Sequence, residues 1–185
     1  EERYFSEAPE EGFYELKDGE LIMHSPVNVD HQRIAGFLGH LLRSFVAERG
    51  LGEIFQAPGV LKLRDGLLRE PDIFFVSSSR RGQIGEQCVH APVELVVEVL
   101  SPDSGERDLV EKRREYEDNG MGEYWAVSPA NDTVVVHTRS DQGFRTREIA
   151  GGTLQSSTVQ GFSIEVDWLW QRPLPNEMEC VRQIL

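Results

Sequence analysis

Three residues, Asp72, Glu98 and Lys112, have the types and the spacing that metal-assisted phosphodiester hydrolysis would use. Asp72 heads an apolar run at 73–76, Glu98 lies inside the run 93–100, and Lys112 follows on a predicted helix. A carboxylate inside such a run loses its hydration unless a cation replaces the water. Two carboxylates from neighbouring strands can hold a divalent metal ion, and a nearby lysine can orient water or neutralise developing charge.

Each of these residues also has an ordinary explanation. An aspartate after Pro71 is common where a strand begins, and Lys112 could pair with Asp108 one turn earlier on the helix. Strand alternation places Glu94 and Glu98 on one face, with Glu98 deeper in the apolar run. A buried Glu98 could be satisfied by an arginine or by backbone groups, although buried acids are enriched at functional sites. The three residues together carry the hypothesis, because hydrolysis needs both metal ligands and a cation.

The composition is typical of a globular protein. With 185 residues, of which 39% are apolar, the chain can form one domain over residues 1–185 with a substantial core. No apolar run reaches the roughly 20 residues needed to cross a bilayer, so we expect no membrane partner. The two cysteines, Cys88 and Cys180, lie far apart, which predicts neither a disulfide framework nor a zinc site. A reducing, cytoplasmic location fits this pattern best.

The charge balance limits the kind of nucleic-acid contact that is possible. The 19 basic and 32 acidic residues give a formal net charge of −13, which repels a polyanion over most of the surface. This argues against a general nucleic-acid coat but is compatible with a local basic groove around metal ions. Arg80, Arg81, Arg107 and the basic run 112–114 lie near the proposed site in the sequence. Taken singly, each of these clusters is more typical of a solvated face.

Hydrophobic periodicity predicts the elements that position these residues. Two alternating segments around Asp18-Gly19, within residues 14–25, predict an N-terminal hairpin. Apolar residues recur at three- and four-residue steps from Val29 to Arg49, which predicts a helix that ends at Gly50. Further strands are expected at 53–56, 60–63, 71–76, 93–100, 123–127, 133–138, 143–149 and 162–166, and further helices at 105–119 and 167–171.

This order of elements predicts an α/β fold. A mixed central sheet is expected to be flanked by helices, with the N-terminal hairpin before it and hairpin strands at 133–138 and 143–149 near the C-terminus. The polar segment 77–92, which contains serines, glycines and paired arginines, is expected to form a mobile loop over the site.

Several of these segments resemble one known family. They are 70–76 (EPDIFFV), 96–102 (VVEVLSP), 108–112 (DLVEK) with Tyr116, 122–127 (GEYWAV), 14–21 (YELKDGEL) and His31-Gln32. Together they resemble the Uma-type restriction endonucleases of bacteria, a former domain of unknown function within the PD-(D/E)XK nuclease superfamily. The resemblance runs from about residue 14 to residue 168.

The resemblance implies a restriction-endonuclease-like core with a Mg²⁺ or Mn²⁺ site at Asp72 and Glu98. The main-chain carbonyl of Val99 is implied as a further ligand. In the commonest pattern of the superfamily the lysine lies two residues after the acid, where this chain has Leu100. The lysine role is therefore carried to Lys112, as in family members that take it from the following helix.

Two further residues are supporting candidates with ordinary alternatives. His31 lies one turn before Ile34 on the buried stripe of its helix and could approach the active edge of the sheet. Glu15 lies on the hairpin and could complete a metal shell. A core histidine that donates to a carbonyl is the more common outcome.

Two classes of function follow from these features. The first is a metal-dependent endonuclease that hydrolyses DNA through a metal-activated water held by Asp72, Glu98 and Lys112. The alternative is a catalytically silent module that shares the nuclease fold and acts in binding, with a homodimer as a candidate assembly. The charge of −13 and the displaced lysine favour this alternative. RNA, branched nucleic acids and small phosphoesters are further substrate classes that the sequence leaves open.

Overall fold

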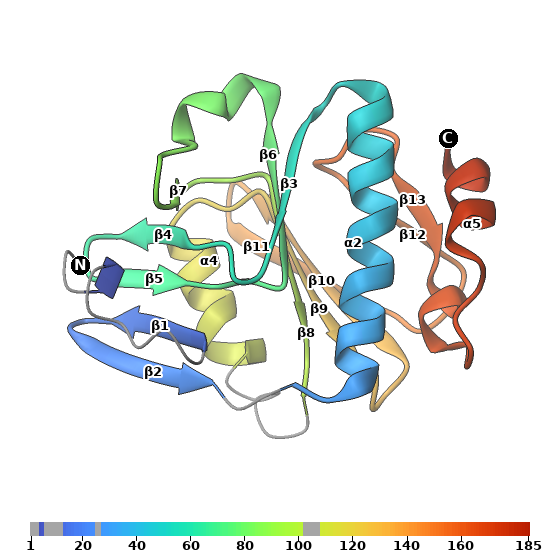
Figure 1. Ribbon diagram of the computed structural model, residues 1–185, viewed down its shortest axis with the longest axis horizontal. Coiled ribbons are helices and arrows are strands. Elements are labelled where there is room, and N and C mark those ends of the chain that lie inside the picture. The colour runs from blue at the N-terminus through green and yellow to red at the C-terminus, as the bar shows by residue number, and fades with distance from the viewer. Residues whose placement is uncertain (1–3, 6–12, 25–26, 102–107) are drawn as a thin grey trace.

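A six-stranded sheet forms the centre of the computed structural model, which describes residues 4–5, 13–24, 27–101 and 108–185 (Figure 1). Strands β8 and β9 are parallel and the other neighbouring pairs are antiparallel, so the sheet is mixed as predicted. In spatial order the strands are β11 (Gly143–Ile149), β10 (Thr133–Ser140), β9 (Glu123–Ser128), β8 (Leu95–Val99), β6 (Ile73–Ser77) and β3 (Gly52–Gln56). The predicted hairpin near the C-terminus is the β10–β11 pair.

A second sheet, which the sequence did not predict as a separate layer, has five strands. The predicted N-terminal hairpin forms one side of it, and its turn at Asp18-Gly19 has positive φ angles at both residues. In spatial order the strands are β2 (Glu20–His24), β1 (Phe13–Lys17), β5 (Leu67–Arg69), β4 (Leu61–Arg64) and β7 (Val89–His90). A small sheet pairs β12 (Thr153–Gln155) with β13 (Ser163–Glu165). Strand β5 is only three residues long, too short to give a periodic signal.

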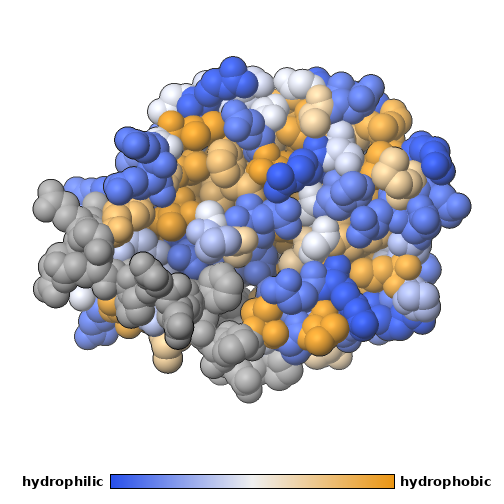
Figure 2. Space-filling model, in the orientation of Figure 1, coloured by the Kyte–Doolittle hydropathy of each residue, from blue (hydrophilic) through white to orange (hydrophobic). Residues whose placement is uncertain are grey.

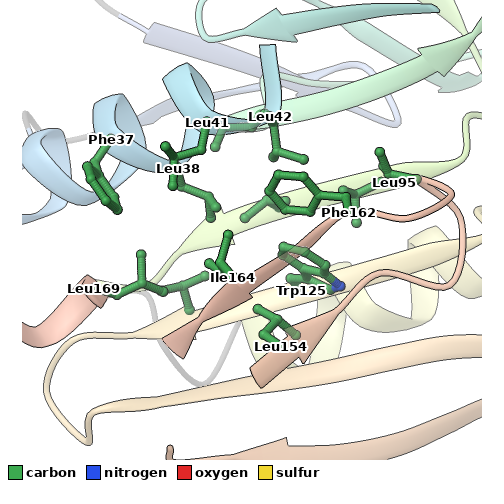
Figure 3. Packing of buried hydrophobic residues seen from close by; sticks show 14 of the residues in the cluster. Phe37, Leu38, Leu41, Leu42, Leu95, Trp125, Leu154, Phe162, Ile164 and Leu169 are labelled. Atoms are coloured by element: carbon green, nitrogen blue, oxygen red, sulfur yellow. The ribbon is translucent and has the colours of Figure 1, made fainter. Parts of the chain in front are cut away.

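Helix α2 (Val29–Arg49) covers one face of the six-stranded sheet and has the bounds that its periodicity predicted. The side chain of Asn28 caps its N-terminus by accepting from the backbone N–H of His31 at 2.8 Å. Gly50 ends the helix in the left-handed region, where φ is 61° and a glycine is favoured. Figure 3 shows the apolar stripe facing the sheet and the C-terminal segments; its labelled residues are Phe37, Leu38, Leu41, Leu42, Leu95, Trp125, Leu154, Phe162, Ile164 and Leu169.

The opposite face of the six-stranded sheet packs against the five-stranded sheet and a short helix. This helix begins with a π-helical turn at Asp108–Lys112 and continues as α4 (Arg113–Asp118). Tyr116 of α4 lies in a second apolar core with Phe74, Val96 and Tyr124. Because side chains alternate along a strand, positions 96 and 98 of β8 and the following Leu100 face this second layer, whereas positions 95, 97 and 99 face α2.

Further helical segments lie in the described part of the chain after β6. They are the 3₁₀ segments at Ser78–Gln83 and Val166–Trp170, and helix α5 (Glu177–Ile184), which packs beside α2. None of the helices that the structure describes combines the length and apolar character of a membrane span. On the face shown in Figure 2, hydrophilic side chains are spread over the surface, and apolar atoms form separate areas between them.

The segment 77–92 does not form a loop over the site, so that prediction was wrong. It contains the 3₁₀ turn Ser78–Gln83 and strand β7, and it starts at the end of β6 that is remote from Asp72. Glu94 ties the segment down by accepting from the backbone N–H of Ser77 at 2.9 Å and from Nε of Arg80 at 2.8 Å. Ser77 and Arg80 are thus held by Glu94, a contact that no local pattern in the sequence shows.

A buried glutamate at the start of β9 anchors the segment that follows β12. The Glu123 side chain is fully buried. Its carboxylate accepts hydrogen bonds from the Ser156 hydroxyl at 2.7 Å, from the Ser157 N–H at 3.1 Å and from the Thr158 hydroxyl at 3.1 Å. Such an acid is satisfied by neutral donors and has a structural role.

We predict that Glu123→Ala lowers the free energy of unfolding by about 3 kcal/mol, because it leaves several buried donors without an acceptor. Urea unfolding followed by circular dichroism measures this change. The control is Glu148→Ala at an exposed position of β11, which should change stability by less than about 0.5 kcal/mol. Equal losses in the two variants would contradict the anchoring role.

Candidate active site

Asp72 and Glu98 converge at one end of the six-stranded sheet. Strands β6 and β8 are antiparallel and pair Ile73 with Val97, so the next position of the register places Asp72 opposite Glu98. Paired residues of an antiparallel ladder point to the same face. The backbone N–H of Val99 also donates to Oδ2 of Asp72 at 2.7 Å, which fixes the carboxylate against β8. The two strands therefore bring the predicted acids together.

Asp72 receives a second donor from the other side of the sheet. Nε2 of His31, from the first turn of α2, lies 3.1 Å from the same Oδ2 atom. Both side chains are largely buried, and Nδ1 of His31 has no hydrogen-bond partner among the described residues. Within that part of the chain, no hydrogen bond reaches Oδ1 of Asp72. The carboxylate is thus held through Oδ2, and Oδ1 is the oxygen that can face a ligand.

Glu98 is held by two donors from the helix that packs on the second layer. Nζ of Lys112 lies 2.9 Å from Oε1 of Glu98, and the hydroxyl of Tyr116 donates to the same oxygen at 2.6 Å. All three side chains are buried. Burial and then the charge of Glu98 raise the pKa of Tyr116 well above its ordinary value, so the phenol stays protonated and donates.

Lys112 lies between two carboxylates. Its Nζ is also 3.3 Å from Oε1 of Glu15, which lies on β1 of the five-stranded sheet. The structure therefore brings together Asp72, Glu98 and Lys112 and also the two supporting candidates, Glu15 and His31. The lysine reaches Glu98 from the helix, although it is not two residues after it in the sequence. The role of Lys112 and the part of the Val99 carbonyl as a metal ligand stay predictions.

An arginine that the sequence analysis did not single out lies next to Glu15. The side chain of Arg69, on β5, is fully buried, and its Nη1 donates to Oε2 of Glu15 at 2.6 Å. Its Nε and Nη2 donate to the two oxygens of Glu115 at 2.8 and 2.7 Å. Burial alone lowers the pKa of Arg69, but the hydrogen bond to Glu115 and the charges of Glu15 and Glu115 outweigh burial and raise it.

The sequence contained two signals for this extension of the site. Arg69 directly follows the apolar pair Leu67-Leu68, and Glu111 and Glu115 are four residues apart on the helix that carries Lys112. The latter spacing places two acids on one helix face. Neither signal identified a partner, because the contacts join segments 42 to 94 residues apart.

The donor set at the end of β6 and β8 suits a hard divalent cation. Among the described residues, no group of three or more carboxylate, imidazole or thiol side chains is arranged as a metal site. Mg²⁺, however, usually keeps several waters and is held by one or two carboxylates together with substrate phosphates. Asp72 and Glu98 provide two such oxygen donors, and a main-chain carbonyl of β8 has the same chemistry. These residues therefore fit Mg²⁺ or Mn²⁺.

The charge of the described cluster agrees with this fit. Its members are three cations (Lys17, Arg69 and Lys112) and five carboxylates (Glu15, Asp72, Glu98, Glu111 and Glu115). Among these lysine, arginine and carboxylate side chains, the formal negative charges outnumber the positive ones by two. A divalent cation would balance this difference and would replace the hydration that burial removes.

We predict that Tyr116 makes the protein less stable in alkali. The native phenol stays protonated while the unfolded phenol ionises near pH 10, so the unfolded state is favoured as the pH rises above 10. The Tyr116→Phe variant lacks this contribution, so its free energy of unfolding should fall less steeply with pH. The difference between the two slopes should reach up to about 1.4 kcal/mol per pH unit. Urea unfolding of both proteins between pH 9 and 11 measures the slopes, and parallel slopes would contradict the prediction.

Comparison with known proteins gives one family match and a structural likeness. The family described as "Uma2: Putative restriction endonuclease" matches residues 2–167. The fold is similar to the crystal structure of a protein from Anabaena variabilis described as "a putative nuclease belonging to DUF820", with a TM-score of 0.73 and 17% sequence identity. The match covers 90% of this chain and 94% of that chain. At this identity the likeness shows a shared fold. No curated protein matches the sequence.

Proposed function

This chain belongs to the Uma2 family, as its motifs predicted, and from this membership and the geometry of the site we propose that it is a metal-dependent endonuclease acting on DNA. The observation that carries the proposal is the meeting of Asp72, Glu98 and Lys112 at one end of β6 and β8. Two acids at one end of the sheet and a cation paired with one of them are the groups that phosphodiester hydrolysis requires.

Asp72 and Glu98, with the main-chain carbonyl of Val99, would hold the metal ion. When bound, Mg²⁺ or Mn²⁺ supplies a Lewis acid that polarises the phosphate and lowers the pKa of water. The chain itself orients the ligands. Val99 N–H and His31 both hold Oδ2 of Asp72, and Tyr116 donates to Oε1 of Glu98. Such outer contacts fix the ligand carboxylates and tune their basicity.

Lys112 provides the positive charge near the scissile phosphate in this proposal. Its ammonium lies 2.9 Å from Glu98 in a buried site, where a charge interacts more strongly than in water. In that position it would stabilise the negative charge that develops as the phosphorus is attacked, and it would keep the two acids from repelling each other.

The intact set of contacts favours an active enzyme over a catalytically silent module. A module without activity has no need to bury Glu98 beside Lys112, because isolated buried ion pairs add little stability. The net charge of −13 makes binding of a polyanion depend on the site itself and on its metal ions.

We predict that the protein nicks supercoiled DNA when Mg²⁺ or Mn²⁺ is present and that EDTA abolishes the activity. Asp72→Asn and Glu98→Gln should each lower the rate by more than about 100-fold, because they weaken the metal ligands. Glu148→Gln, an exposed acid on β11, is the matched control and should keep the wild-type rate. Gel separation of supercoiled, nicked and linear forms measures the rates.

Two results would contradict the proposal. One is cleavage that persists in the Asp72→Asn, Glu98→Gln double variant. The other is a wild-type protein that neither binds Mn²⁺ in calorimetric titration nor cuts DNA, which would favour the silent module. A protein that binds Mn²⁺ through these acids but cuts only RNA or branched DNA would keep the chemistry and change the substrate class.

A further inference from the structure

We propose that Arg69 is a positioning residue that holds the Lys112 ammonium between Glu15 and Glu98. As a statement about catalysis, this inference rests on the proposed function. As a statement about the geometry of Lys112, it can be tested without any activity. It assigns a role to a fully buried arginine on β5. This strand belongs to the five-stranded sheet, and none of its own residues is a predicted metal ligand.

The pairing of β1 with β5 brings Arg69 to the site. The antiparallel register pairs Leu16 with Leu68, so the next position places Glu15 opposite Arg69 on one face. One nitrogen of the guanidinium then donates to Oε2 of Glu15 at 2.6 Å. Oε1, the other oxygen of Glu15, lies 3.3 Å from Nζ of Lys112. Glu15 therefore links the arginine to the lysine.

A second route runs through the helix that carries Lys112. Arg69 donates through Nε and Nη2 to both oxygens of Glu115, a bidentate contact that only the planar guanidinium can make. Glu115 is one turn beyond Lys112 on the same helix. The same guanidinium thus fixes the five-stranded sheet to the helix and sets the distance from which Lys112 reaches Glu98.

Lysine needs such support more than most residues. Its ammonium is a point charge on a flexible four-carbon stem, and it can shift between two acids at little cost in conformational energy. Without Arg69, the charge of Glu15 would lose its partner at 2.6 Å and would attract the ammonium more strongly. Lys112 would then move toward Glu15 and away from Glu98, at the expense of catalysis.

The first test measures the protection of the Lys112 amine in the metal-free protein. The chain has three lysines, Lys17, Lys62 and Lys112, so acetylation by acetic anhydride followed by mass spectrometry resolves each one. In Arg69→Lys we expect Lys112 to be acetylated at least ~5-fold faster than in the wild type, because an amine that has lost its contact with Glu98 is held on one side only and opens to solvent more often. Lys62 lies on β4 with Asp65 at 2.8 Å and should keep its rate.

The control is Arg64→Lys, the same substitution on the same sheet. Arg64 forms an exposed pair with Asp18 at 2.9 Å, and among the described residues no hydrogen bond or ion pair joins it to Lys112, Glu15 or Glu98. The Arg64→Lys substitution should leave the acetylation rate of Lys112 unchanged. The proposal is overturned if Lys112 stays protected in Arg69→Lys, or if Lys62 and Lys112 gain the same factor, which would show general loosening.

Glu15→Gln keeps the test decisive if Arg69→Lys does not fold. The amide retains an acceptor for Arg69 but removes the charge that faces Lys112, so acetylation of Lys112 should again rise while that of Lys62 does not. Unchanged protection in this variant would overturn the link through Glu15.

The second test separates positioning from a general structural role. On the proposed DNA substrate, Arg69→Lys should lower kcat by about 10- to 100-fold with little change in KM, because it acts on the site through its neighbours. In a Lys112→Met background the same substitution should cost nothing further, since the residue it positions is absent. Additive losses would overturn the proposal. If the wild type cuts no DNA, the proposed function fails and the acetylation test still decides the role of Arg69.

Discussion

The ion pair between Lys112 and Glu98 is the interaction on which the arrangement of the site depends. Both groups are removed from water, and the loss of hydration costs on the order of several kcal/mol per ion. The attraction between the two charges offsets this cost only when further hydrogen bonds satisfy both groups. Tyr116 adds one hydrogen bond to Glu98, and Glu15 adds a second negative charge beside Lys112. Glu15 then needs Arg69, and Arg69 needs Glu115. Each buried charge requires the next, until the series reaches Lys17 near the surface.

This requirement explains why the second sheet lies where it does. The six-stranded sheet alone carries Asp72 and Glu98, but the groups that compensate them come from other layers: His31 from α2, Lys112 and Tyr116 from the helix ending in α4. The five-stranded sheet contributes Glu15 and Arg69 through the pairing of β1 with β5.

Three acids near strands show how burial alone fails to identify a functional residue. Glu94 accepts from Ser77 and Arg80 and ties down the following turn. Glu123 is even more deeply buried than Glu98, but its partners are the neutral donors around Ser156. Glu98 differs because its partners are a lysine and a tyrosine and because Asp72 lies across the ladder. The kind of partner distinguishes a candidate catalytic acid from an acid that holds a loop.

The sequence by itself determined the elements whose signal is local. The apolar stripe of α2 predicted its bounds, the Asp18-Gly19 turn predicted the first hairpin, and alternation along the run 93–100 placed Glu94 and Glu98 on one face. The chemistry of the acids and the lysine was also predictable in outline, because a carboxylate buried in an apolar run needs a cation or hydrogen-bond donors around it. Only the tertiary structure decided that Lys112 meets Glu98 and that neutral donors meet Glu123.

Strand β5 is three residues long, and the contacts of Arg69 with Glu15 and Glu115 span 54 and 46 residues of chain. Their existence depends on strand register and on how a helix packs across two sheets, and neither leaves a periodic trace in the sequence. Local patterns reflect which face of an element is buried. The partner that meets a buried charge is fixed only when distant segments pack together.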